Sequence, residues 1–430
     1  MLLEITPTFE KAMSLMENTN QNVFITGKAG TGKSTLLKHF RSQTKKNIVV
    51  VAPTGVAAVN VNGQTIHSFF KFSPSTTVDT VRRYSGNPAH NIYKKIDALV
   101  IDEISMVRAD LLDCIDKSLR INGRNPDCPF GGAQLIFFGD LFQLPPVVPA
   151  VEREIFQSYY QSPYFFSAKS FQNLDMTTIE LDKIYRQSDS DFIHLLNAIR
   201  NDLCRPEDLE RINGRLDTNF RFMPDSPHMY LTPRNFTADT VNTRMLGLLD
   251  TEAHTFEAKI KGDFGKEYHP APFVLTLKKG ARVMLVNNDA EKRWINGTMA
   301  TVTSITPQQH QTEIAVRLDN GQIYSVKPFT WNVSKFVVEN NRIEAATMGE
   351  FKQFPLILAW TMTIHKSQGK TFDKILLDLG NQGAFSPGQV YVALSRATSL
   401  EGITLTHPIH PKSIWVDPTI NHFAQAKDSV

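Results

Sequence analysis

Short apolar runs, each ending in a polar or glycine-rich segment, recur through the first third of the chain. They occupy residues 22–26, 47–52, 98–101 and 135–138. Because these runs do not alternate polar with apolar positions, they predict parallel strands covered on both faces. Helical periodicity after Pro7 and from Ser34 to Phe40 predicts helices beside them. The pattern therefore predicts an α/β domain with helices on both faces of its sheet.

The pattern restarts at Met176 and changes character near residue 255. A helix at 189–201 and strands at 229–232, 356–360 and 375–378 predict a second α/β domain. Between 255 and 353 short strand-like segments replace the helices, and Asn320-Gly321 suits a hairpin turn. The predicted domains are residues 1–175, with an exposed insertion at about 71–95; residues 176–254 continued by 354–430; and a small inserted barrel at 255–353.

The segment Gly27-Lys-Ala-Gly-Thr-Gly-Lys-Ser-Thr35 fits the phosphate-loop pattern Gly-x4-Gly-Lys-Ser/Thr at every required position. Glycines let the backbone curl, its N–H groups point at phosphate oxygens, and the following helix N-terminus adds positive potential. We expect Lys33 to neutralise the β- and γ-phosphates of ATP and Ser34 to bind Mg²⁺. The predicted nucleotide-binding residues are Gly30, Thr31, Gly32, Lys33, Ser34 and Thr35.

Asp102-Glu103, at the end of an apolar run, is a second signal for nucleotide chemistry. We expect Asp102 to bind Mg²⁺ with Ser34, and Glu103 to polarise the attacking water. Gln143 follows the next apolar run, where a sensor of the γ-phosphate would lie. A polar residue in a proline-stiffened turn explains Gln143 equally well.

Composition says more about the cellular compartment of the protein than about its activity. A net charge of +3 over 430 residues neither demands nor excludes nucleic acid. Cys114, Cys128 and Cys204 have no metal-ligand spacing and suit a reducing compartment. No apolar run approaches ~18 residues, and the N-terminus lacks a secretory pattern. We therefore expect a cytoplasmic protein without a membrane partner.

Further polar groups follow predicted strands in both halves. His67 and Phe69 could grip a single strand through phosphate contacts and stacking, although a packed turn explains the same residues. Arg186 and Arg396, in the second half, could reach a phosphate across a domain cleft. Taken alone, Arg396 is better explained as a surface residue.

Six segments resemble, in order, the motifs of superfamily-1 helicases. They are the phosphate loop, Ala52-Pro-Thr-Gly-Val-Ala-Ala58, Ile101-Asp-Glu-Ile-Ser105, Gly139-Asp-Leu-Phe-Gln-Leu-Pro145, Thr363-Ile-His-Lys-Ser-Gln-Gly369 and Tyr391-Val-Ala-Leu-Ser-Arg396. The chain most resembles the petite-integration-frequency helicase family of superfamily 1B, with RecD-like helicases as more distant relatives. Pro129-Phe-Gly-Gly132 and Ile184-Tyr-Arg-Gln187 resemble further signatures of that family.

The resemblance implies two RecA-like domains, with a small wedge inserted in the first and an SH3-like barrel in the second. It implies ATP- and Mg²⁺-dependent 5′-to-3′ movement on single-stranded DNA, and unwinding of forked or tailed duplexes, RNA–DNA hybrids and G-quadruplexes. The resemblance also implies roles in DNA repair, recombination and telomere maintenance. Carried over by motif, the ATP-site residues are Lys33, Ser34, Asp102, Glu103, Gln143, Arg186, Gly369 and Arg396. The DNA-contact residues are Thr54, His67, Arg234, Asn235, Thr363, His365 and Lys366, with Phe69 and Phe72 as stacking candidates.

One segment departs from the family pattern. The family opens with Leu-Asn-x-Glu-Gln, whose glutamine contacts adenine, whereas Phe9 stands at that position here. We expect Gln21 or Asn22, just before the first strand, to substitute. A monomer in solution is also expected.

Three classes of function fit these residues. The leading expectation is an ATP-dependent DNA helicase. The second is a DNA-stimulated ATPase that remodels or clamps nucleoprotein without unwinding. The third is a single-strand-binding module with a vestigial ATPase, against which the intact Asp102, Glu103 and Arg396 argue.

Overall fold

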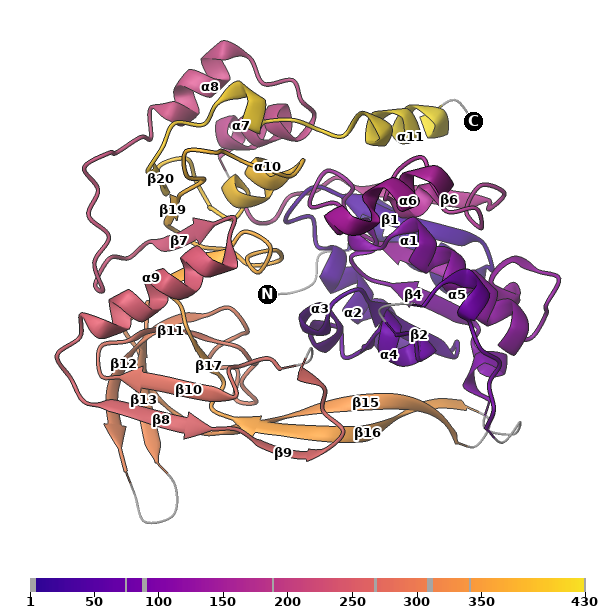
Figure 1. Cartoon of the computed structure of the whole chain (residues 1–430), viewed down its shortest axis with the longest axis horizontal. Helices are drawn as coiled ribbons and strands as arrows, with labels where there is room; N and C mark the ends of the chain where they lie inside the picture. The colour runs from indigo at the N-terminus through magenta and orange to yellow at the C-terminus, as the bar shows by residue number, and fades with distance from the viewer. Residues whose placement is uncertain are drawn as a thin grey trace. The chain divides into compact units, whose positions relative to one another are not determined.

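The computed structural model describes residues 5–73, 76–86, 91–187, 189–266, 269–307, 312–339 and 342–428 of the chain (Figure 1). The chain divides into two compact units. The first comprises Met1–Tyr185, Val333–Met348 and Asp417–Val430, and the second comprises Arg186–Asn332 and Gly349–Val416.

The first unit is built on a six-stranded parallel sheet in the order β3-β2-β4-β5-β1-β6. Its strands are β1 (Asn22–Gly27), β2 (Ile48–Ala52), β3 (Gln64–Thr65), β4 (Ala98–Ile101), β5 (Gln134–Phe138) and β6 (Met176–Leu181). Its helices are α1 (Pro7–Asn18), α2 (Lys33–Gln43), α3 (Gly55–Asn60), α4 (Ile66–Phe70), α5 (Ala109–Asn122), α6 (Arg153–Tyr159) and α11 (Pro418–Asp428). The four apolar runs of the sequence are the four central strands of this sheet.

Both faces of this sheet are buried. On one face, Met16 and Phe40 from the helices pack with Ile25 in a single apolar cluster. Phe24 and Phe137 point to the opposite face, where each meets the ring of Phe165 edge-on, at 5.6 and 5.5 Å. Burial on both faces explains why these strands carry apolar residues at consecutive positions.

The structure differs from the predicted boundary at residues 175 and 176. Strand β6 pairs with β1 along its whole length, from Asn22↔Met176 to Gly27↔Leu181. The backbone N–H of Tyr185 also donates to the carbonyl of Gly30 (2.9 Å). The first unit therefore runs to Tyr185, because β6 completes its sheet.

The predicted insertion at 71–95 is only partly exposed. It contains the 3₁₀ turns Val78–Thr80 and Ile92–Lys95. The Tyr93 ring is buried and stacks on Phe70 at 5.9 Å, and its hydroxyl donates to the Phe69 carbonyl (3.0 Å). The second turn is thus a packed part of the unit, held by aromatic contacts.

The second unit contains a four-stranded parallel sheet in the order β18-β7-β19-β20. Its strands are β7 (Met229–Thr232), β18 (Thr361–Thr363), β19 (Ile375–Leu377) and β20 (Ile403–Leu405). Its helices are α7 (Ser190–Arg200), α8 (Pro206–Asn213), α9 (Asn235–Gly247) and α10 (Gln389–Leu394). A second parallel sheet with helices is thus present, as the sequence predicts, but residues 176–185 and 417–430, which the sequence assigns to this domain, belong to the first unit.

Antiparallel strands occupy the region where the sequence predicts a barrel. One sheet has the order β14-β13-β12-β11-β17, and two smaller sheets have the orders β10-β8 and β15-β16-β9. The strands are β8 (Ala253–Glu257), β9 (Lys259–Gly262), β10 (Val274–Lys278), β11 (Arg282–Leu285), β12 (Met299–Thr306), β13 (Glu313–Leu318), β14 (Ile323–Val326), β15 (Phe329–Glu339), β16 (Arg342–Gln353) and β17 (Leu356–Leu358). Closure into an SH3-like barrel stays a prediction.

The sequence predicts that the apolar run 356–360 is one strand of the parallel sheet. In the structure it is not. Leu356–Leu358 pairs with β11 in the antiparallel sheet, and the parallel strand β18 begins only at Thr361. Between them, the fully buried Trp360 donates its indole N–H to the Pro224 carbonyl (2.9 Å). The run is apolar throughout because it leads from the core of the antiparallel sheet to that of the parallel sheet.

Two expectations from composition can be compared with the structure. None of the described helices has the length and apolar character needed to cross a membrane. All three cysteines are free thiols.

The segment Pro129–Gly132 forms a 3₁₀ turn against α5. The Asp116 carboxylate accepts the Phe130 backbone N–H (2.6 Å), which fixes the turn. Gly131 (φ +65°) lies so close to α5 that an added Cβ would sit 2.4 Å from the Leu119 carbonyl oxygen. At Gly132 (φ +78°) the nearest side-chain atom would be 3.8 Å away.

We predict different costs for the two glycine substitutions. Gly132→Ala should lower the free energy of unfolding by about 1 kcal/mol, because only the positive φ is unfavourable. Gly131→Ala adds a clash with backbone and should lower it by about 2–4 kcal/mol. Denaturant unfolding of both variants measures the difference. Equal losses would contradict the close packing of this turn on α5.

Candidate functional site

The phosphate loop joins β1 to α2 at the carboxyl edge of the first sheet. Gly30 (φ 84°) and Gly32 (φ 89°) adopt conformations that side chains disfavour. At Gly27, an added Cβ would lie 2.6 Å from the Leu181 carbonyl oxygen. The curl of the loop thus depends on the glycines that the pattern requires.

Lys33 is the first residue of α2, and its side chain folds over the loop. Its Nζ donates to the carbonyl oxygens of Gly27 (2.5 Å) and Lys28 (3.0 Å). Ser34 and Thr35 follow, exposed, in the first turn of the helix. A positive charge and hydroxyl groups at a helix N-terminus form a binding site for phosphate.

Asp102 follows β4 at the same edge of the sheet. Its side chain is buried, and the adjacent Glu103 adopts a left-handed backbone (φ 51°). Burial first, and then the charge of Glu103, raise the pKa of the Asp102 carboxyl to about 7, whereas Lys33 lowers it. A divalent cation would offset both unfavourable effects. Because Mg²⁺ in nucleotide sites uses one or two protein oxygens plus phosphates, Ser34 and Asp102 fit this ion.

Gln143 follows β5, the strand between β4 and β1. Its side-chain amide donates to the buried Asp140 carboxylate (3.1 Å). At Gly139, an added Cβ would lie 2.8 Å from the Ile104 side chain, so the segments after β4 and β5 pack closely. Lys33, Asp102, Glu103 and Gln143 therefore all follow strands that end at one sheet edge.

The predicted substitutes for adenine recognition lie at the wrong end of the sheet. Gln21 lies just before β1 and Asn22 is its first residue, whereas the phosphate loop follows the other end, so the six-residue strand separates them by about 16–20 Å. The Asn22 amide is also occupied, donating to the Asp175 carbonyl (3.0 Å) and accepting the Leu135 N–H (2.8 Å). Phe9 is buried in the core beside His39. At the position where the family pattern has an adenine-contacting glutamine, this chain therefore has a packing residue.

Two of the four predicted DNA contacts in the first unit are core residues instead. The Phe69 and Phe72 side chains are 6% and 9% exposed and pack against Phe70, which leaves no open ring face for a base. Thr54 is exposed at the N-terminus of α3, and its hydroxyl accepts the Ala57 N–H (3.3 Å). His67 lies half-buried on α4, and burial lowers the pKa of its imidazole.

The predicted DNA contacts of the second unit share one edge of its sheet. Thr363 of β18 pairs with Thr232 of β7, so the segments that follow both strands leave the sheet side by side. Those segments carry the predicted DNA contacts Arg234, Asn235, His365 and Lys366. Thr363 itself is buried, and its hydroxyl accepts the Lys366 N–H (3.3 Å), so it shapes the turn.

Arg396 is buried rather than on the surface. Its guanidinium donates to the carbonyls of Val392 (2.8 Å), Lys370 (3.2 Å) and Ser367 (3.4 Å) and to the Ser395 hydroxyl (2.7 Å). Arg186 donates to the Ser395 carbonyl (3.2 Å) and to the Gly369 carbonyl (3.5 Å). Both arginines therefore bind the backbone of the turn that follows His365 and Lys366.

Sequence reasoning missed two residues that hold this region together. Gln187 donates its side-chain amide to the carbonyls of Ser395 (3.1 Å) and Ala397 (3.0 Å). Asn242 of α9 bonds both backbone groups of Thr361, donating at 2.8 Å and accepting at 3.0 Å. Side-chain amides that satisfy backbone groups leave no signal in a single sequence.

A family sequence model described as PIF1-like helicase matches residues 5–209, and another, described as Helicase, matches residues 281–423. The chain is 34% identical over 430 residues to the ATP-dependent DNA helicase Pif1 of Bdellovibrio bacteriovorus, covering 98% of this chain and 92% of that protein. It is 35% identical to human ATP-dependent DNA helicase PIF1, covering 94% of this chain but 61% of the human protein.

The solved structures that this chain resembles are also Pif1 helicases. The chain resembles Bacteroides sp Pif1 in complex with ADP-AlF4, with a TM-score of 0.91, 38% identity and coverage of 99% of this chain and 98% of that chain. The same identity and coverage relate it to Bacteroides Pif1 with ADP-AlF3 and single-stranded DNA (TM-score 0.72) and to a structure of two coordinating Pif1 helicases that concerns unwinding at forked duplex DNA (TM-score 0.71).

We predict that Lys33→Ala lowers nucleotide hydrolysis by about 10²-fold or more, since it removes the positive charge at the phosphates. Gln21→Ala, at the opposite sheet edge, should leave hydrolysis and nucleotide affinity unchanged. Turnover and nucleotide binding measured on both proteins test the pair. Normal turnover in Lys33→Ala would refute the phosphate-loop assignment, and a loss of nucleotide affinity in Gln21→Ala would restore Gln21 to the site.

Proposed function

The chain belongs to the PIF1-like helicase family, and from that premise we propose that it moves 5′-to-3′ along single-stranded DNA and unwinds tailed or forked duplexes. We extend the proposal to G-quadruplexes and RNA–DNA hybrids. The observation that carries it is the joint arrangement of the phosphate loop and Asp102 at one sheet edge, in a chain similar along its length to a Pif1 bound to ADP-AlF4.

The nucleotide side of the mechanism uses residues of the first unit. Lys33 and the loop amides bind phosphate, while Ser34 and Asp102 would hold Mg²⁺, which when bound would neutralise charge on the phosphates. Glu103 orients and polarises the attacking water, and Gln143, next to Asp140, senses the γ-phosphate. Each role is a proposal that follows from the strand ends at which these residues lie.

The DNA side uses Thr54 and His67 in the first unit and Arg234, Asn235, His365 and Lys366 in the second. The complex of Bacteroides Pif1 with ADP-AlF3 and single-stranded DNA supports single-stranded DNA as the ligand that these residues would bind. Cationic and hydrogen-bonding groups of this kind bind phosphates and sugars regardless of base sequence.

Coupling between the two sides is proposed to run through Arg396 and Arg186. Arg396 donates to the carbonyls of Ser367 and Lys370, and Arg186 donates to those of Gly369 and Ser395. Residues 367–370 directly follow His365 and Lys366, the proposed DNA contacts. To reach a γ-phosphate, either guanidinium must exchange some of these hydrogen bonds for the nucleotide. DNA that moves the turn would thereby change how readily the arginines reach the phosphate.

We predict that a duplex with a 5′ single-stranded tail is unwound with ATP and that one with a 3′ tail is not. Strand displacement followed with a fluorescent strand on both substrates measures the polarity. A preference for the 3′ tail would overturn the proposed direction. DNA-stimulated hydrolysis without displacement on either substrate would favour the remodelling ATPase.

We also predict that Arg396→Lys lowers DNA-stimulated turnover by about 10³–10⁵-fold while nucleotide binding stays measurable, because an arginine finger acts mainly on the transition state. Arg215→Ala is the matched control, since Arg215 likewise donates to backbone carbonyls, those of Ile403 (2.9 Å) and Glu401 (2.8 Å). Turnover, nucleotide affinity and thermal unfolding are measured on the same preparation of each protein. Turnover within a few-fold of wild type in Arg396→Lys would dispose of the finger role.

A further inference from the structure

Phe236 is an aromatic side chain that no role above uses. It lies in the first turn of α9, and its side chain is 80% exposed. Its ring makes no contact with another ring among the described residues. A single exposed apolar residue carries no meaning by itself, so its surroundings decide.

Helix α9 is fixed by its other face. Ala238 and Met245 are buried, and Val241 packs with Met245 into the apolar cluster of the antiparallel sheet. Asn242 ties the helix to the backbone of Thr361 in β18. Phe236 belongs to neither set of contacts, so the core does not explain it, and the anchored helix presents it at a defined place.

That place is the edge of the sheet that carries the proposed DNA contacts. Phe236 follows Arg234 and Asn235 directly, and the register Thr363↔Thr232 puts the segment with Lys366 alongside. Arg234 and Lys366 are both exposed. An aromatic ring beside phosphate-binding cations is the combination that binds single strands without sequence preference.

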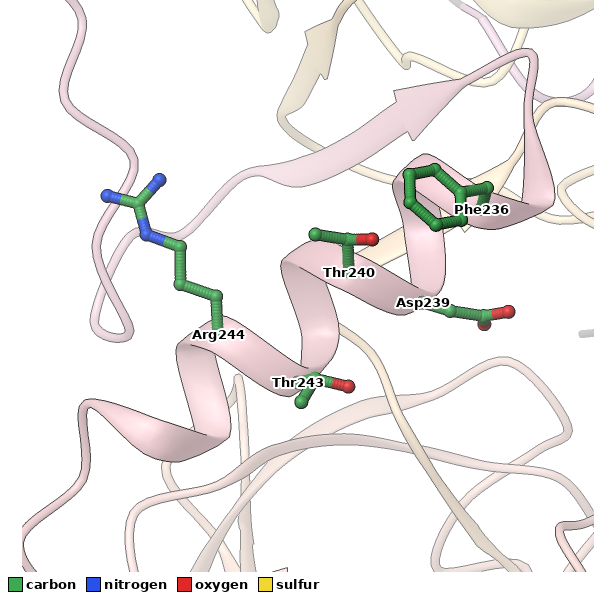
Figure 2. A pocket seen from close by; sticks show the side chains of 5 residues that line it. All are labelled: Phe236, Asp239, Thr240, Thr243 and Arg244. Atoms are coloured by element: carbon green, nitrogen blue, oxygen red, sulfur yellow. The ribbon is translucent and has the colours of Figure 1, made fainter.

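The outer face of α9 continues this surface. An open hollow of about 460 Å³ is lined by Phe236, Asp239, Thr240, Thr243 and Arg244. In Figure 2, Phe236, Thr240 and Arg244 project to one side of the helix, and Asp239 and Thr243 project to the other. The row at i, i+4 and i+8 therefore presents a ring, a hydroxyl and a guanidinium over about 12 Å, with the Asp239 carboxylate at the flank of the same hollow.

We propose that Phe236 is a base-stacking residue for single-stranded DNA, with Arg244 binding a phosphate farther along α9. This inference rests on the proposed function and adds one stacked base to a grip otherwise made through the backbone. Stacking is independent of salt, whereas each phosphate neutralised contributes roughly −0.7 to the salt slope of affinity. The two contributions can therefore be measured separately.

The test is the affinity of the full chain for a labelled thymidine oligonucleotide, with and without a run of abasic positions, across salt concentrations. Phe236→Ala should bind the intact strand about 5- to 20-fold more weakly, with the salt slope unchanged, and should lose little further affinity on the abasic strand. Arg244→Gln should instead reduce the salt slope by roughly 0.7. Leu203→Ala, at a residue 68% exposed between α7 and α8, should match wild type.

Phe236→Trp is the control for misfolding, because it keeps an aromatic ring at this position. It should keep wild-type affinity, and its added indole fluorescence should be quenched by the intact strand and less by the abasic one. Phe236→Ala that binds both strands as wild type does would overturn the inference and leave the proposed function intact. A wild-type protein that binds no single-stranded DNA would overturn the proposed function itself.

Discussion

Parallel strands end at a common edge of their sheet, and this constraint organises both units. In the first unit, the segments after β1, β4 and β5 bring the phosphate loop, Asp102 and Gln143 to one edge. In the second, the segments after β7 and β18 bring Arg234 and Lys366 together. Residues far apart in sequence thus meet without any long-range signal, because strand direction alone sets where each side chain leaves the sheet.

The second unit adds a buried polar network to that edge. Arg396 and Arg186 bind carbonyl oxygens of the turn that follows Lys366, and Gln187 binds those of Ser395 and Ala397. Buried donors of this kind are costly to leave unpaired, so the turn and the arginines are held as one piece. A displacement of the turn after Lys366, which we propose to contact DNA, would therefore also move the arginines that we propose to act on the nucleotide.

The sequence predicts what local patterns specify. The phosphate loop, Asp102 and the parallel strands are recognisable because a few adjacent residues determine each of them. What tertiary packing decides was predicted less well. Phe69 and Phe72 turn inward, and the run 356–360 divides between two sheets, since an apolar residue carries no mark of which core it enters. Gln21 and Asn22 lie at the start of β1, which is the end away from the phosphate loop.

The central claim is that hydrolysis in the first unit depends on DNA bound at the edge of the second. ATP turnover of the wild-type chain, titrated with single-stranded DNA alongside DNA binding on the same preparation, tests it most directly. The account predicts strong stimulation that saturates at the DNA concentration that saturates binding. Turnover that stays constant while DNA binds would contradict it.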